Sequence, residues 1–121
     1  MVSTEPTMAD YIVIDRDGDE RDRQLEGHEL PGDGVSFILV DMAPGGAVRL
    51  HRHAYAEIFI THEGSATYTV GSTRLAVRAG QIVIVSPGVP HGFVNSGDTR
   101  LRQTNVHLSR RIVTEWLEDR G

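Results

Sequence analysis

The sequence predicts an all-β domain, and two features carry this prediction. Short runs rich in β-branched and aromatic residues recur from Tyr11 to Leu108, and glycine or proline interrupts nearly every gap between them. Many short strands separated by regular turns are typical of a β-sandwich or β-barrel. The length of 121 residues suits one such domain and is too short for two barrels.

The first third of the chain contains two predicted strands. Residues 1–9 are polar and include a proline, which predicts a flexible N-terminal tail. Tyr11–Ile14 has the composition of a short strand, and the charged, turn-rich segment 15–24 follows it. Val35–Met42 has the composition of a buried strand and leads into a Pro-Gly-Gly turn.

Strands are then predicted at short intervals as far as residue 108. They are Val48–His53, Ile58–His62, Ala66–Val70, Arg74–Val77, Ile82–Val85, Gly92–Asn95 and Leu101–Leu108. After Ser109, a candidate N-cap, the apolar residues fall on one helical face at Ile112, Val113, Trp116 and Leu117. The sequence therefore divides into the tail 1–9, a β-barrel over 10–108 and a short amphipathic helix over 109–121.

Four side chains suggest a metal site. His51 and His53 are two residues apart, so an extended strand places both imidazoles on one face. Glu57 follows after a gap short enough to bring its carboxylate to the same point, and His91 could supply a fourth ligand. Three imidazoles and one carboxylate suit Fe, Mn, Ni, Zn or Cu better than Ca or Mg. The sequence thus predicts one bound divalent transition metal.

These residues resemble the two sequence motifs of the cupin superfamily. The first motif is matched at every spacing by Gly45, His51, His53, Glu57 and Gly64. The second is matched by Gly80, Gly88, His91 and Asn95, with Ser86 at the family's proline position. The resemblance implies a double-stranded β-helix, or jelly roll, in which His51, His53, Glu57 and His91 hold one metal ion.

The resemblance also implies a range of functions. Four protein ligands on a six-coordinate metal leave two positions for a chelating substrate, or for a substrate and dioxygen. We therefore expect an enzyme that acts on a small oxygenated acid or enolisable ketone, as a dioxygenase or as a lyase, decarboxylase or isomerase. The alternatives are a non-catalytic barrel that binds a metal or small molecule, such as a sensor, and an accessory partner of a larger enzyme.

Two residues beside the motif are candidates for catalysis. Arg49 lies two positions before His51, so on a regular strand it shares the face of that imidazole and could clamp a substrate carboxylate. If it faces solvent instead, it is an ordinary residue of the barrel rim. Tyr55 lies between His53 and Glu57, where a phenol could donate or accept a proton.

Further side chains are candidates for binding the substrate. Phe59, Tyr68 and Phe93 are expected to form apolar walls of the interior. The last strand has a polar face that contains Gln103, Asn105 and His107. If this face points inward, Gln103 and Asn105 can hydrogen-bond the substrate; if the opposite face does, which is the more ordinary arrangement, the polar set contacts only solvent.

Composition limits the partners and the compartment. The formal net charge of −5 and the lack of a basic cluster argue against nucleic acid. No apolar run reaches membrane-spanning length and no export signal is evident, so we expect a cytoplasmic protein. Ile58 and Ile60 lie on the strand face opposite Glu57 and Phe59 and need cover, which predicts a homodimer.

Overall fold

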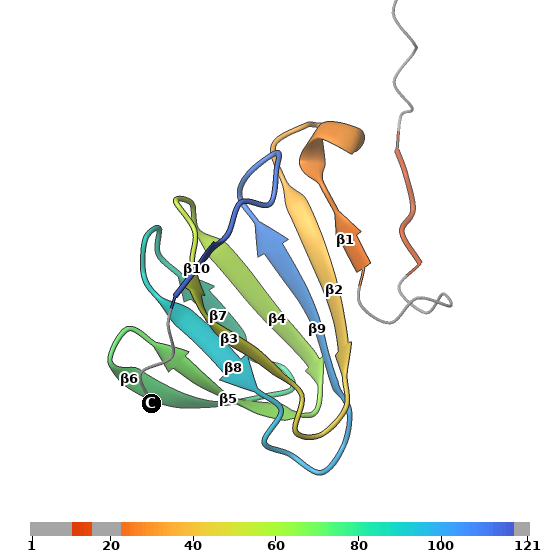
Figure 1. Ribbon diagram of the computed structural model, residues 1–121. Coiled ribbons are helices and arrows are strands. Elements are labelled where there is room, and N and C mark those ends of the chain that lie inside the picture. Colours follow the sequence, from red (N-terminus) through yellow and green to blue (C-terminus); the bar gives the residue numbers. More distant parts are fainter. Residues whose placement is uncertain (1–10, 16–22, 118–121) are drawn as a thin grey trace, which may run out of the picture.

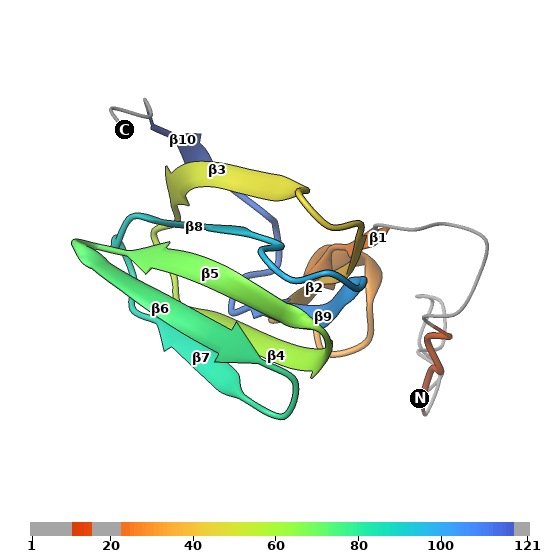
Figure 2. The ribbon, with the colours of Figure 1, turned by 90° about the horizontal axis from the view of Figure 1, so that it is seen from below.

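The computed structural model describes residues 11–15 and 23–117, which form two facing five-stranded antiparallel sheets (Figures 1 and 2). The first sheet has the order β1 (Arg23–Leu25), β2 (Ser36–Met42), β9 (Leu101–His107), β4 (Glu57–Glu63), β7 (Ile82–Val85). The second has the order β10 (Glu115–Trp116), β3 (Ala47–Arg52), β8 (His91–Val94), β5 (Ser65–Val70), β6 (Thr73–Arg78). A short 3₁₀ turn, η1 (Gly27–Glu29), joins β1 to β2. This strand order is that of a jelly roll, which confirms the predicted fold.

Strand periodicity explains which side chains reach the interior. Along β4, Glu57, Phe59 and Thr61 are buried, whereas Ile58 and Ile60 are only partly covered on the outer face. Burial of alternate residues is expected where one face of a sheet packs on the core and the other faces outward. The predicted inward direction of Glu57 and Phe59 is therefore confirmed.

The N-terminal part departs from the prediction. Tyr11–Ile14 forms no strand, and the predicted tail over 1–9 lies outside the described residues. The first strand is instead Arg23–Leu25, which begins in the segment predicted to be turn-rich and pairs with β2. Because β1 is an edge strand with one neighbour, its backbone pairing tolerates the charged and polar side chains that made the segment resemble a turn.

The predicted C-terminal helix is wrong over the residues that the structure describes. Residues 109–117, which we call the C-terminal strap, bend over 109–111 and contain no helix, and β10 pairs with the edge of β3. Alternate residues of this segment, Ile112, Thr114 and Trp116, line the cavity, as the period of two in an extended chain allows. An unpaired edge of β3 favours the extended form through backbone pairing. No described residue belongs to a helix long and apolar enough to span a membrane.

The core fills the end of the barrel away from the strap. Phe59, Tyr68 and Phe93 are at most 6% exposed, and their ring centroids lie 5.1 to 6.1 Å apart. Aromatic rings at such separations attract one another in addition to burying apolar area. Phe59 and Phe93 also line a cavity, so the rigid core directly supports one wall of it.

Candidate metal centre

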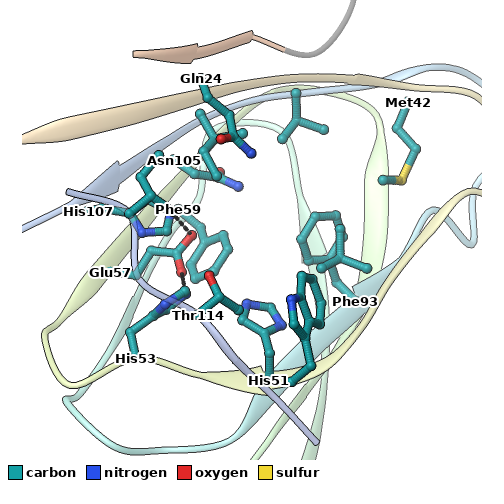
Figure 3. A pocket seen from close by; sticks show the side chains of 15 residues that line it. Gln24, Met42, His51, His53, Glu57, Phe59, Phe93, Asn105, His107 and Thr114 are labelled. Atoms are coloured by element: carbon teal, nitrogen blue, oxygen red, sulfur yellow. Dashed lines mark ion pairs between the residues drawn. The ribbon is translucent and has the colours of Figure 1, made fainter. Parts of the chain in front are cut away.

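Three histidines and one glutamate converge inside the barrel. Ligand-type atoms of His51, His53, Glu57 and His91 all lie within 4.8 Å of one another. Each of these residues is at most 5% exposed, and Figure 3 shows His51, His53 and Glu57 on one side of a cavity. His51 lies near the end of β3, His53 directly follows that strand, and Glu57 and His91 begin β4 and β8. The structure therefore brings the four predicted ligands together.

Backbone carbonyls set the tautomer of the three imidazoles. In each ring Nδ1 lies 2.8 to 2.9 Å from a carbonyl oxygen. The pairs are His51 with Arg49, His53 with Val113, and His91 with Val89. Because a carbonyl only accepts, Nδ1 carries the hydrogen, and the lone pair of each neutral ring resides on Nε2. All three imidazoles are thus prepared to ligate through Nε2.

The contacts of the Glu57 carboxylate fit a shared cation. Its Oε1 lies 3.0 Å from His53 Nε2 and 3.1 Å from His91 Nε2. Two ligands at right angles on a metal, each about 2.1 Å away, are about 3.0 Å apart. Among the described residues, His53 Nε2 has no hydrogen-bond partner although it is buried. Lone pairs that face a carboxylate oxygen repel it unless a cation lies between them, so this donor set fits a divalent transition metal.

Burial and neighbouring contacts favour the ligating protonation states of His51 and Glu57. Burial lowers the pKa of His51 to about 4, so that imidazole is neutral. Burial alone would raise the pKa of Glu57, but the surrounding contacts, the largest of which is with His107, outweigh it and hold the pKa well below its usual range. A neutral imidazole and an ionised carboxylate are the forms that bind metal ions.

A cavity of about 360 Å³ adjoins the four-residue cluster (Figure 3). Its wall includes three members of the cluster and residues of β1, β2, β9 and the strap. The lining residues are Gln24, Ile38, Val40, Met42, Val48, His51, His53, Glu57, Phe59, Phe93, Asn105, His107, Ile112, Thr114 and Trp116. A small organic molecule in this space would reach the cluster from the side of His51, His53 and Glu57.

The polar face of β9 points inward. Gln103, Asn105 and His107 are at most 3% exposed, so the alternative in which this face meets solvent is wrong. Asn105 lines the cavity together with Phe59 and Phe93. Gln103 and Tyr68 do not line it, because Gln103 Nε2 donates to the Tyr68 hydroxyl within the core. Of the five predicted substrate-binding residues, three thus reach the cavity.

Arg49 does not share the face of His51. The pairing of β3 with β8 shifts register between Val48 and His51, and both of these residues line the cavity. The extra residue turns Arg49 outward, where its guanidinium lies 4.7 Å from the Trp116 ring and donates to the Leu117 carbonyl. The predicted clamp on a substrate carboxylate is therefore not formed.

A glycine of β8 permits this irregularity. A Cβ atom on Gly92 would lie 2.8 Å from the Val48 carbonyl oxygen, closer than side chains approach backbone atoms. Only glycine lets the two backbones come this near. Since Gly92 follows His91 directly, the same close approach helps to place His91 beside His51, whose ring centroids are 4.3 Å apart.

Tyr55 acts on the cluster through His107, which the sequence analysis did not select. The Tyr55 hydroxyl accepts a hydrogen bond from Val113 N at 3.2 Å and donates to His107 Nδ1 at 2.8 Å. Burial raises the pKa of Tyr55 to about 12, so the phenol keeps its hydrogen. His107 therefore carries its own hydrogen on Nε2, which lies 3.2 Å from Glu57 Oε2 without the alignment of a hydrogen bond. This contact leaves Oε1 to face His53 and His91.

We predict that His107 positions Glu57 for metal binding. His107→Ala should lower the affinity for Mn(II) or Co(II) about 10–100-fold, as is common when a group that orients a ligand is removed. His107→Gln, whose amide can donate to Glu57, should recover part of the loss, and Tyr55→Phe should cause a smaller loss. Competition with a fluorescent chelator measures these affinities. An unchanged affinity in His107→Ala, with unchanged melting of the metal-free protein, would exclude the positioning role.

Comparison with solved structures shows the same fold in an oxalate oxidase and in oxalate decarboxylases. The chain superposes on an oxalate oxidase with a TM-score of 0.69 and 23% identity, covering 88% of this chain and 60% of that one. For Bacillus subtilis oxalate decarboxylase, studied at its Mn(II) centres, the TM-score is 0.73 and the identity 22%, and the match covers 79% of this chain and 28% of that one. For a predicted oxalate decarboxylase from Thermotoga maritima, the TM-score is 0.56 and the identity 24%, and the match covers 62% of this chain and 64% of that one.

The chain thus spans less than two thirds of each of these proteins. No curated protein matches the sequence. The sequence model of the cupin domain matches residues 38–107, a range that contains all four residues of the cluster. Because this match covers more than half of the chain and agrees with the jelly-roll topology, the protein belongs to the cupin family.

Proposed function

We propose that this protein is a metal-dependent enzyme that converts a small oxygenated organic substrate at a divalent transition metal held by His51, His53, Glu57 and His91. The observation that carries the proposal is the arrangement around Glu57 Oε1, which faces two buried Nε2 atoms at 3.0 and 3.1 Å beside a cavity. A structural metal site is fully coordinated by protein ligands and needs no adjoining cavity, whereas a catalytic site needs space for its substrate.

The residues of the chain have separate parts in this proposal. A divalent metal supplies Lewis acidity to an oxygen of the substrate and, if redox-active, electron transfer with dioxygen. Phe59, Phe93 and Trp116 exclude water from the substrate side of the cavity. Asn105, which is 3% exposed, orients a polar group of the substrate, and His107 holds Glu57.

The reaction type is open to a direct experiment. Support for metal-dependent chemistry in general comes from structural neighbours that are an oxalate oxidase and an oxalate decarboxylase. Fe(II)-loaded and Mn(II)-loaded protein is titrated anaerobically with a panel of small oxygenated chelators, and oxygen uptake and products are then measured. Turnover with oxygen consumption identifies a dioxygenase or oxidase, and turnover without it identifies a lyase, decarboxylase or isomerase. Binding of the chelators without any turnover would contradict an enzyme and support the sensor or accessory protein.

We further propose that the protein is a homodimer joined through the outer face of β4 and β7. Ile58 pairs with Ile84 and Ile60 with Ile82, so four isoleucines adjoin on this face. Ile82 and Ile84 are 60% and 66% exposed, and exposed apolar patches of this kind mark interfaces. The strand Ile82–Val85 carries no charged side chain, so like charges do not meet where two copies of this strand face each other.

Light scattering tests this assembly. At micromolar concentration we expect twice the 13.3 kDa of one chain. Ile84→Asp should shift the protein to the monomer, because it places a charge within the apolar face. A wild-type protein that is monomeric at this concentration would refute the dimer.

A further inference from the structure

The cavity beside the cluster is nearly free of charged side chains. Among the described lining residues, Glu57 is the only acid, and none is a lysine or arginine. The other polar lining residues, apart from the cluster itself, are Gln24, Asn105, His107 and Thr114. The remaining wall is apolar and consists of Ile38, Val40, Met42, Val48, Phe59, Phe93, Ile112 and Trp116. Arg49 and Arg52, the cations nearest in sequence to the cluster, are exposed and lie outside this wall.

The charge balance of the site follows from its residues. A divalent metal contributes +2, and Glu57, which ligates as a carboxylate, contributes −1. Each imidazole that ligates the metal through Nε2 is neutral, because its one hydrogen is then on Nδ1 against a backbone carbonyl. The loaded site therefore carries a net charge of +1. A ligand with one negative charge neutralises it, whereas a dianion leaves a buried negative charge with no cation in the wall to compensate it.

We infer that the substrate of the proposed enzyme is a monoanionic oxygen chelator with an apolar body, such as an enolised ketone or an acidic hydroxyketone, rather than a dicarboxylate. The ionised oxygen and its neighbour occupy the metal, and the body packs against the aliphatic and aromatic wall. Asn105 Oδ1 has no hydrogen-bond partner among the described residues, so it can accept from a hydroxyl or N–H of that body. This inference rests on the proposed function and names its substrate class.

Two probes of opposite character test the inference. Tropolone is a monoanionic chelator that binds through two oxygens and carries a hydrocarbon ring, and oxalate is a dianion without an apolar part. Calorimetric titration of Mn(II)-loaded protein gives a dissociation constant for each probe, and the metal content is measured after dialysis to show that neither removes the ion. We expect tighter binding of tropolone than of oxalate.

Variants of the cavity wall show whether charge is the cause. Met42→Lys adds a cation on an unbranched side chain of similar length, and Met42→Gln is its neutral control. We expect the lysine variant to improve oxalate binding relative to tropolone by at least about tenfold, because an opposite charge now lies within the cavity. Ile38→Lys, with Ile38→Gln as its control, repeats the test from the position that pairs with Asn105.

The outcomes separate this inference from the proposed function. Equal or tighter binding of oxalate by the wild-type protein would overturn the inference, and so would binding of neither probe to a loaded site. The same holds if neither lysine variant changes the ratio of the two dissociation constants. A wild-type protein that retains no metal would overturn the proposed function as well.

Discussion

Replacement of His51 by alanine is expected to lower the affinity for divalent metal by at least about 100-fold. Removal of a group that merely orients a ligand costs roughly 10–100-fold, and loss of a ligand removes a bond to the metal itself. His51 also lies directly against His91 and His53, with ring centroids 4.3 and 4.9 Å away, so its loss opens the centre of the cluster. Elemental analysis after dialysis, together with chelator competition, measures the effect.

His62→Ala provides the matched control for this variant. His62 is exposed at the end of β4, and its Nε2 contacts the Thr104 hydroxyl at a distance of 2.8 Å, outside the cluster. We expect it to retain wild-type metal content. Both variants should keep the melting behaviour of a folded barrel, because neither touches the core of Phe59, Tyr68 and Phe93. Full metal occupancy in His51→Ala would show that the cluster is not the binding site.

Removal of the strap is expected to weaken metal binding about 10–100-fold and to open the cavity. A chain that ends at Arg111 lacks the Val113 carbonyl, which sets the tautomer of His53, and the wall residues Ile112, Thr114 and Trp116. Loss of the group that orients a ligating imidazole commonly lowers the metal affinity about 10–100-fold. The shorter chain keeps the backbone contact of Arg110 with His28 and the contact of Ser109 with Ser36, which fasten the start of the strap.

A chain that ends at Leu117 is the control for this truncation. It retains β10 and its pairing with β3, so its metal affinity and tropolone binding should equal those of the full chain. We expect the chain ending at Arg111 to bind tropolone more weakly as well, since Trp116 no longer covers the site. If it binds metal as tightly as the full chain, the strap has no part in the metal centre.

The metal cluster could be predicted because its spacing depends on local geometry. His51 and His53 lie near the regular end of β3, and Glu57 begins the next strand after a short turn. Strand alternation also correctly placed Phe59 inside and Ile58 outside. The second cupin motif indicated His91. No local rule connects His91 to His51, and only the family resemblance placed the two side by side.

Two wrong predictions, for Arg49 and for the C-terminus, have the same physical cause: strand pairing changed the period at which side chains alternate along the chain. A register shift before His51 breaks the alternation that would have put Arg49 in the cavity. At the C-terminus, pairing with the edge of β3 selects an extended chain where the apolar spacing also fitted a helix. His107 was overlooked because its role depends on Tyr55, 52 residues away in the chain, and on the strap.

Anomalous X-ray scattering at the metal edge tests the central claim most directly. Crystals of the protein loaded with Mn(II) or Co(II) are measured above and below the absorption edge of the metal. We predict one strong anomalous peak per chain, about 2.0–2.3 Å from the Nε2 atoms of His51, His53 and His91 and from Glu57 Oε1. No peak at this position, or a peak only at the partly exposed cluster of Glu26, His28 and Glu29, would contradict the account.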